Sequence, residues 1–329
     1  MSYTHLTSHE RSVLEHLHRQ GIKPAQIAVQ LGRSRSTLGR ELERNKPTPR
    51  CRYRARRAVE LAARRRAAAN ARRARLRDRP LREAVTARLS RGWSPQVIAG
   101  RLAREHRRDR LMHVCGMTIY RWLRRDAQAD GDLSRHLPRR GKGRKPNGTR
   151  QNRCPAPGRR RIAGRPRGAQ RRSRFGHWEI DTLEGARKAS YLVSLVDRKS
   201  RFTLLGKAAD KTVATVNTAV GQMLGRLTDP LRRTITADNG NEFNGYESLE
   251  RRFDLAFYFA DPNRPDQRGT NEQTNGLVRR YLPKHTDFNA VSDARLAKIE
   301  SLLNNRPRVC LDYRTPAEVI PLPAVALRV

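Results

Sequence analysis

Apolar residues along this chain follow two different spacings. In the first part they recur every three to four residues, as in Val13, Leu14 and Leu17, and this spacing predicts helices with one buried face. From Phe175 onward, short apolar runs and alternating segments such as His177–Leu183 take over, which is typical of strands. The pattern therefore predicts an all-helical N-terminal region followed by an α/β region.

Residues 1–48 are predicted to form a helix-turn-helix DNA-binding domain. Pro24 suits the first turn of a helix, and Ala28 and Gly32 supply a small contact residue and a chain reversal, as this motif requires. A plain helical hairpin is the alternative. The helix after the turn should contact DNA, and the candidate contacts are Arg33, Arg35, Ser36, Thr37 and Arg40.

Three basic segments follow this domain. Residues 49–91 are rich in Arg and Ala and predict a basic connector helix, with a solvated linker helix as the alternative. Residues 92–136 predict a second helical DNA-binding unit that exposes Arg121, with a dimerisation bundle as the alternative. Residues 137–174 predict a flexible basic linker, because 15 Lys and Arg and no acidic residue occur between positions 138 and 174.

The α/β region, residues 175–329, predicts a specific order of elements. Three strands come first, and a helix, a strand, a helix, a further strand and closing helices follow. The strands are expected at His177–Leu183, Tyr191–Val196, Phe202–Leu205, Thr234–Ala237 and Leu255–Phe259. This order is that of the ribonuclease-H-like fold, so the chain is predicted to be multidomain, with helical DNA-binding units before an α/β core.

The charge of the chain is large and uneven. Its net charge is +40, with 48 basic and 12 acidic side chains in residues 1–175 and 23 basic and 19 acidic ones afterwards. Such a charge favours nucleic acid as the partner over an acidic membrane surface, although a ribosomal-type protein or an Arg-rich proteome would also produce it. The N-terminal part is therefore expected to bind phosphate, and the near-neutral part to carry the chemistry.

Other classes of protein are disfavoured by composition. The chain has no apolar run near the ~18 residues that a membrane helix needs, and its N-terminus has no signal-peptide pattern. The four cysteines are far apart and form no C-x-x-C pair, which argues against a disulfide framework and a zinc site. These features predict a cytoplasmic protein with no membrane contact.

Three acidic residues stand out as a candidate catalytic site. Asp181 lies within the first predicted strand, Asp238 at the end of the fourth, and Glu272 near the start of a helix. In a ribonuclease-H-like sheet the first and fourth strands are neighbours, so these carboxylates can converge. A cluster of carboxylates is stable when cations neutralise it, and oxygen ligands suit two Mg²⁺ ions, with Mn²⁺ as a substitute. Taken singly, each acid would more often be a surface or cap residue.

Several nearby residues are weaker candidates. Glu179 shares the strand face of Asp181, and Glu184 and Glu242 are also close in sequence. A structural role is favoured for His177 over a catalytic one. Two amides, Asn239 and Asn275, are candidates to orient a phosphate or a metal-bound water. Two arginines, Arg268 and Arg279, are candidates to contact DNA phosphates, and a solvated surface role is the alternative for them.

At these residues the sequence resembles the transposases of the insertion-sequence-30 family. The motifs are His177–Asp181, Thr236–Phe243, Gln267–Leu277 and Leu303–Glu318, joined by Gly32–Thr37 and Trp93–Gln96 near the N-terminus. The resemblance covers nearly the whole chain. It implies an integrase-type catalytic core, Asp181, Asp238 and Glu272 as the catalytic triad, Mg²⁺ as cofactor, and terminal inverted repeats and target DNA as substrates. It also implies a homo-oligomer on paired element ends, in a bacterial nucleoid.

Two departures from the family pattern concern positioning. Pro265–Gln267 stand where the family often has an aromatic residue and an acid, and Ile180 stands where it often has Gly. Neither removes a catalytic carboxylate. Two other functions stay open: a DNA-binding transcriptional regulator or inactive transposase relic, and a ribonuclease-H-like nuclease that acts on another nucleic acid.

Overall fold

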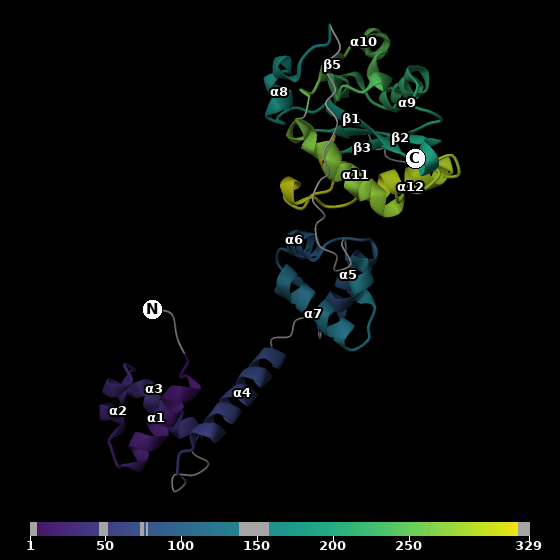
Figure 1. Ribbon diagram of the computed structural model, residues 1–329. Coiled ribbons are helices and arrows are strands. Elements are labelled where there is room, and N and C mark those ends of the chain that lie inside the picture. Colours follow the sequence, from purple (N-terminus) through teal and green to yellow (C-terminus); the bar gives the residue numbers. More distant parts are fainter. Residues whose placement is uncertain are drawn as a thin grey trace. The chain divides into compact units, whose positions relative to one another are not determined.

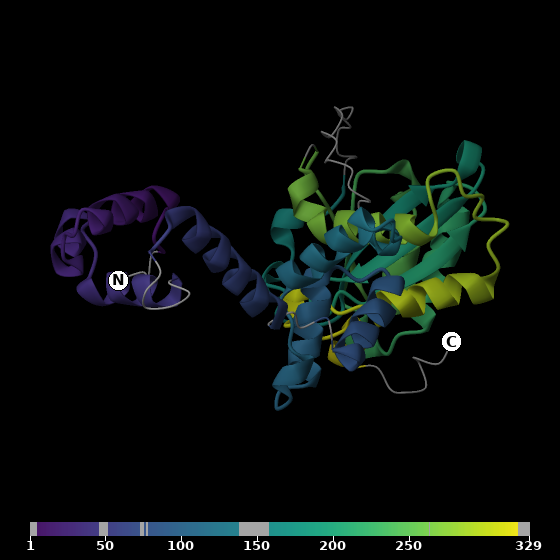
Figure 2. The ribbon, with the colours of Figure 1, turned by 90° about the horizontal axis from the view of Figure 1, so that it is seen from below.

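The chain is described by a computed structural model (Figures 1 and 2) that covers residues 5–45, 52–72, 76, 78–137, 158–262 and 264–321. By its internal contacts it divides into two compact units, Met1–Arg77 and Asp78–Val329. Most of the predicted basic linker, residues 138–157, lies outside the described residues. No helix in the described part of the chain is long and apolar enough to cross a membrane.

The first unit is helical, as the sequence predicts. Its core packs the fully buried side chains of Leu14, Ile27 and Leu38. Gly32 makes the turn between the second and third helices with a φ of 60°, a left-handed conformation that glycine adopts without strain. The helices are α1 (Ser8–Arg19), α2 (Pro24–Gln30), α3 (Arg35–Asn45) and α4 (Ala55–Arg72).

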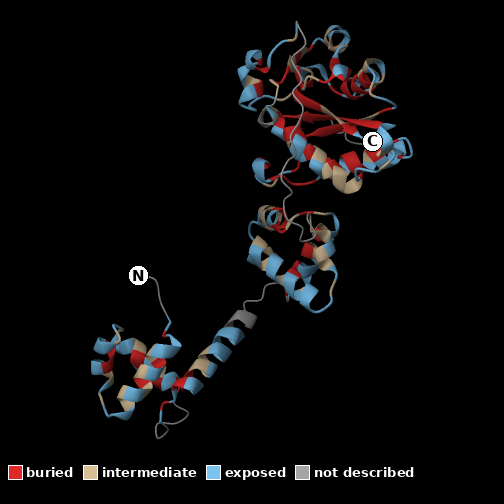
Figure 3. Ribbon diagram, in the orientation of Figure 1, coloured by how far each residue is buried: buried red, intermediate tan, exposed pale blue. Residues whose placement is uncertain are grey.

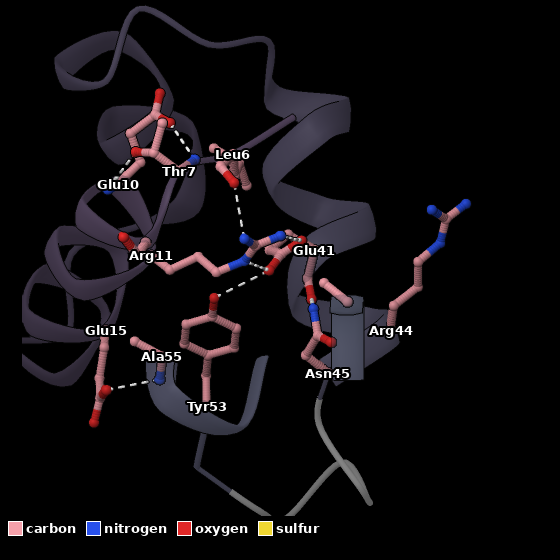
Figure 4. Close-up of polar contacts among 12 residues, drawn as sticks. Leu6, Thr7, Glu10, Arg11, Glu15, Glu41, Arg44, Asn45, Tyr53 and Ala55 are labelled. Carbon is pink, nitrogen blue, oxygen red and sulfur yellow. Dashed lines mark hydrogen bonds and ion pairs between the residues drawn. The ribbon is translucent and has the colours of Figure 1, made fainter. Parts of the chain in front are cut away.

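A buried polar network joins the start of α4 to this helical core (Figure 4). The Arg11 guanidinium donates to Glu41 at 2.6 Å, and the Tyr53 hydroxyl donates to the same carboxylate at 3.2 Å. The Glu15 carboxylate accepts from the backbone N–H of Ala55 at 2.8 Å. Tyr53 and Ala55 are both buried. The helix-turn-helix core therefore extends into residues that the sequence analysis expected in the connector.

The second unit begins with a group of helices, α5 (Arg79–Ser90), α6 (Pro95–Glu105) and α7 (Gly116–Gln128). Side chains of α6 contact the end of the chain. Arg101 forms an ion pair with Glu318 at 2.7 Å, and Arg104 forms one with Asp312 at 2.6 Å. The carbonyl of Gly92 accepts from both Arg280 at 3.0 Å and Arg306 at 2.6 Å. The helical group is therefore joined to the α/β part through α6.

The described residues of the α/β part form a five-stranded sheet in the order β3-β2-β1-β4-β5. Strand β1 pairs antiparallel with β2 and parallel with β4. Buried strands lie between helices on both faces, as Figure 3 shows in red. The strands are β1 (His177–Glu184), β2 (Tyr191–Asp197), β3 (Thr203–Ala208), β4 (Thr234–Ala237) and β5 (Ala256–Phe259).

The two faces of the sheet carry different helices. On one face, α9 (Val213–Gly225) and α10 (Tyr246–Phe253) cover a core that includes Trp178 and Ile180. On the other, α11 (Gly269–Tyr281) and α12 (Asp293–Asn304) cover a second core that includes Leu183. Because side chains alternate along a strand, the odd-numbered residues of β1 from position 179 to 183 lie on the α11 face.

Residues 158–174, which the sequence analysis expected in the linker, pack against this sheet. Arg161 forms a parallel bridge with Phe259, and the backbone N–H of Phe259 donates to the carbonyl of Arg160 at 2.9 Å. Ile162 and Ala169 are buried. The high charge of the segment conceals these apolar contacts in the sequence.

Candidate active site

Asp181 and Asp238 lie side by side because of the register of two parallel strands. In the β1–β4 pair, His177 is opposite Thr234 and Glu179 is opposite Thr236. Continued two residues further, this register sets Asp238, the residue after the end of β4, opposite Asp181. The Asp181 carboxylate accepts from the backbone N–H of Thr182 at 3.0 Å, which fixes its rotamer. Two of the three acids predicted to converge therefore lie close together in the fold.

Both carboxylates contact the same cation, the guanidinium of Arg268. Its Nη2 donates to Oδ2 of Asp238 at 3.1 Å, and its Nη1 lies 3.6 Å from Oδ1 of Asp181. Nη1 also donates to the carbonyl of Ile180 at 3.1 Å. Arg268 is only 9% exposed. One buried guanidinium therefore bridges the two acids.

Asn275 orients the Asp181 carboxylate from the opposite side. Its amide Nδ2 donates to Oδ2 of Asp181 at 2.8 Å, and its Oδ1 accepts from the Ser194 hydroxyl at 2.9 Å. Ser194 lies directly opposite Asp181 in the β1–β2 register. Asn275 is among the predicted site residues and Ser194 is not, although a single Ser within the apolar run Tyr191–Val196 is a usable signal.

Glu272 lies on α11, one helical turn before Asn275, and it is exposed. No three His, Cys, Asp or Glu side chains among the described residues are grouped closely enough to hold one metal ion. The fold thus brings together Asp181 and Asp238 but does not gather Glu272 with them. Three carboxylates at one point repel each other, so the third is expected to approach only against added positive charge.

Glu179 has a different role from its neighbour Asp181. It is fully buried, forms an ion pair with Arg198, and accepts from the backbone N–H of Asn271 at 3.1 Å. Asn271 is in the first turn of α11, the helix that carries Glu272 and Asn275. Glu179 therefore anchors the start of that helix to the strand that carries Asp181.

The other acidic and supporting candidates hold the fold. Glu242 is buried and contacts Lys211 at 3.2 Å and the Thr182 hydroxyl at 3.0 Å. His177 shares a hydrogen bond with the Thr234 hydroxyl at 2.9 Å, and burial, aided by the charge of Arg233, lowers its pKa to about 4. The imidazole is therefore neutral at physiological pH, in accord with the structural role.

Two further candidates from the sequence bind backbone groups. Asn239 donates to the carbonyl of Ala260 at 2.8 Å. Arg279 donates to the carbonyl of Glu184 at 2.7 Å, and its guanidinium stacks near the ring of Phe288. Asn239 thus ties the residue after Asp238 to the end of β5, and Arg279 ties α11 to the end of β1.

The candidate DNA contacts in the helical parts differ in how far they are exposed. Arg35, Ser36 and Arg40 are exposed on α3, and Thr37 is half-buried. Arg33 forms an ion pair with Glu10 at 2.7 Å, so it also connects the turn to α1. Arg121 is exposed on α7.

Comparison with known proteins places the chain among recombination enzymes with an integrase core. Residues 171–265 match the family of integrase core domains, and residues 2–45 match a family of helix-turn-helix domains. The chain belongs to the insertion-sequence-30 family of transposases, as its relatives show. It is a DNA-binding transposase that cleaves DNA and transfers strands, and integrase cores depend on divalent cations.

Three relatives illustrate the membership. The transposase for insertion sequence element IS4351 of Bacteroides fragilis is 33% identical, over 95% of this chain and 94% of its own length. Transposase InsI for element IS30A of Escherichia coli K12 is 35% identical, over 96% of this chain and 83% of its own. The transposase for element IS1086 of Cupriavidus metallidurans is 36% identical, over 97% of this chain and 94% of its own.

Solved structures show weaker likeness. The catalytic core domain of BIV integrase matches with a TM-score of 0.35 and 19% identity, over 44% of this chain and 92% of that one. A chain of the simian T-cell lymphotropic virus intasome matches with a TM-score of 0.38 and 17% identity, over 54% of this chain and 62% of that one.

Proposed function

We propose that this transposase cleaves and joins DNA at the terminal inverted repeats of its insertion sequence, with Asp181, Asp238 and Glu272 as the catalytic triad. The observation that carries the proposal is the convergence of Asp181 and Asp238 on one buried cation, Arg268. Carboxylate oxygens are the donors that Mg²⁺ prefers, and Mn²⁺ accepts the same set. We therefore assign two Mg²⁺ ions to Asp181 and Asp238, with Glu272 approaching as the third carboxylate when the ions bind.

The reaction consists of two in-line displacements at phosphorus. In the first, water attacks the phosphodiester at the element end, the bond to the 3′ oxygen breaks, and a 3′-OH is released. In the second, that 3′-OH attacks a phosphodiester of the target DNA and displaces its 3′ oxygen. Bound divalent ions would supply activation of the attacking oxygen and charge neutralisation of the leaving one. Asn275 holds the Asp181 carboxylate in one orientation during both steps.

DNA recognition is assigned to the helical parts. We expect Arg35, Ser36, Thr37 and Arg40 on α3 to read the inverted repeat in the major groove, with Arg33 beside them. Arg121 on α7 and Arg279 near the acids would contact phosphates, and Asn239 would hold the loop beside Asp238. A homo-oligomer joins two element ends and meets target DNA, which places the protein at the bacterial nucleoid.

The test is cleavage of an end-labelled duplex that contains one element end. Full-length protein with Mg²⁺ should nick the duplex at the end and release a 3′-OH. Addition of EDTA should abolish nicking and leave the protein–DNA complex intact in a gel shift. A protein that binds the duplex but does not nick it in Mg²⁺ or Mn²⁺ would instead be a DNA-binding regulator, the alternative function.

Replacement of Arg268 by Gln should tighten metal binding in the absence of DNA. The Arg268 guanidinium lies within 4 Å of both carboxylates, so it opposes any second cation there. In a Mn²⁺ titration followed by electron paramagnetic resonance, we expect Arg268→Gln to lower the dissociation constant about tenfold or more. Arg251→Gln, at an exposed position on α10, serves as the matched control. An unchanged Mn²⁺ affinity in Arg268→Gln would contradict the proposal that Mn²⁺ and the Arg268 guanidinium compete for Asp181 and Asp238.

A further inference from the structure

A cluster of arginines with few acidic partners lies near the start of α11, beside the candidate active site. We propose that three arginines, Arg172, Arg201 and Arg308, bind a backbone phosphate of the DNA strand that reacts at Asp181 and Asp238. The bound phosphate neighbours the reacting phosphate on that strand. The three residues are here called the arginine cluster. This inference rests on the proposed function. It assigns a binding site to residues that the catalytic steps do not use.

Arg201 reaches the start of α11 from the turn between β2 and β3. Its Nη1 donates to the Thr270 hydroxyl at 2.7 Å. The turn is rigid, because the buried Asp197 carboxylate accepts from the backbone N–H and the hydroxyl of Ser200, both at 2.7 Å. Arg201 itself has a φ of 63°, in the left-handed region. A strained, tightly held turn thus fixes the position of this guanidinium.

Arg308 comes from the segment after α12, and that segment adjoins the same turn. Asn304 at the end of α12 accepts from the backbone N–H of Thr203 and donates to its carbonyl, both at 2.8 Å. Arg308 is 9% exposed, and its Nη2 lies 3.5 Å from the carbonyl of Leu303, which is a long hydrogen bond. The cluster therefore joins two segments that are a hundred residues apart in sequence.

Two buried donors of the cluster are unused. Nε of Arg201 and Nε of Arg308 have no hydrogen-bond partner among the described residues. A buried polar group without a partner is costly, and a buried guanidinium more so. Guanidinium groups left short of acceptors in this way are suited to a ligand that brings several acceptor oxygens to their Nη atoms.

The charge of the cluster is also uncompensated. Burial lowers the pKa of Arg308 to about 10, and the positive charge of Arg201 acts in the same direction. Arg172 is exposed, and partial desolvation with repulsion from Arg201 lowers its pKa. Among the described residues, the carboxylate that acts on Arg172 is Glu179, which is already bound to Arg198 and Asn271. The fold thus holds positive charge that a bound anion would neutralise.

The position of the arginine cluster, close to the candidate active site, indicates which phosphate it would bind. Glu179 and Asp181 lie on one face of β1, two residues or about 7 Å apart, and the cluster lies toward the Glu179 end. The amino end of the 13-residue helix α11 adds a favourable dipole. Guanidinium groups match the geometry of phosphate oxygens. A free phosphate ion has the same chemistry, so the experiment has an arm for each source.

The DNA arm is a cleavage assay in which single phosphates near the element end are made neutral as methylphosphonates. With wild-type protein, one neutral position beside the reacting phosphate should lower kcat/KM about tenfold. With Arg201→Gln or Arg308→Met, kcat/KM should fall by a similar factor on normal DNA, and the same neutral position should cause no further loss. Arg251→Gln, on the exposed face of α10, is the matched control and should keep the wild-type response.

The ion arm follows the thermal unfolding of the full chain without DNA. Inorganic phosphate should raise the Tm of wild-type protein above its value in chloride at equal ionic strength, and this rise should vanish in Arg308→Met. The Tm of Arg308→Met in chloride should equal or exceed that of wild type, because an unpaired buried charge is removed. A purely structural arginine would instead lower the Tm.

Two results overturn the inference. One is a lower Tm for Arg308→Met with the phosphate response intact. The other is a methylphosphonate position that lowers kcat/KM by the same factor in the cluster variants as in wild type. If wild-type protein cleaves no end DNA, the proposed function fails, and the ion arm alone then decides whether the arginine cluster binds phosphate.

Discussion

Replacement of Asp238 by Asn should reduce strand cleavage about a thousandfold or more, a loss of ~4 kcal/mol of transition-state stabilisation. Asn keeps the shape of the side chain and the oxygen that accepts from the backbone N–H of Gly240 at 2.9 Å. It loses the negative charge that faces Arg268 and that a divalent ion requires. The fold and the helix-turn-helix are untouched, so we expect the affinity for the inverted repeat to stay within about twofold.

The measurement is a cleavage rate on end DNA alongside fluorescence anisotropy of the same duplex. Asp229→Asn is the matched control, since its carboxylate is 92% exposed and pairs with Arg232 on the surface. It should retain cleavage and binding. Retention of cleavage by Asp238→Asn would remove this residue from the catalytic triad.

Replacement of Glu179 by Ala should lower the free energy of unfolding by about 3–5 kcal/mol, as loss of one partner from a buried ion pair does. Glu179 and Arg198 are 0% and 6% exposed in their side chains. The change leaves the Arg198 guanidinium buried without its carboxylate and the backbone N–H of Asn271 without an acceptor. Urea unfolding of the full chain, with the α/β part followed by its tryptophan fluorescence, measures the effect.

A second variant separates charge loss from packing loss. In Glu179→Met combined with Arg198→Met, both charges are removed and two apolar side chains fill the space, so much of the stability should return. Cleavage should remain impaired, because the first turn of α11 has lost its anchor to β1. If Glu179→Ala unfolds at the wild-type urea concentration, the pair does not stabilise the fold.

The sequence predicted the α/β part well because its strands carry strong local patterns. The apolar run at Tyr191–Val196 became β2 (Tyr191–Asp197), and Thr234–Ala237 became β4 with the same bounds. Parallel pairing of β1 with β4 then sets Asp181 beside Asp238. Local pattern and the known order of strands were enough to select these two acids.

Contacts between distant residues could not be predicted. Arg268 bonds to Ile180 across 88 positions, and nothing local to Arg268 marks it as the cation between the acids. The ion pair of Arg101 with Glu318 spans 217 positions in the same way. Residues 158–174 were misleading for another reason, because charge dominates their composition while Ile162 and Ala169 make the packing contacts.

A change of both ligand and metal shows whether Asp238 binds the divalent ion used in strand cleavage. In Asp238→Cys, a thiolate replaces the carboxylate, and soft sulfur ligands bind Mg²⁺ poorly but accept Mn²⁺ better. We express the cleavage rate of this variant as a fraction of the wild-type rate in the same metal. We expect this fraction to be close to zero in Mg²⁺ and at least about tenfold higher in Mn²⁺. Equal loss in both metals, or full activity in Mg²⁺, would contradict metal binding by Asp238.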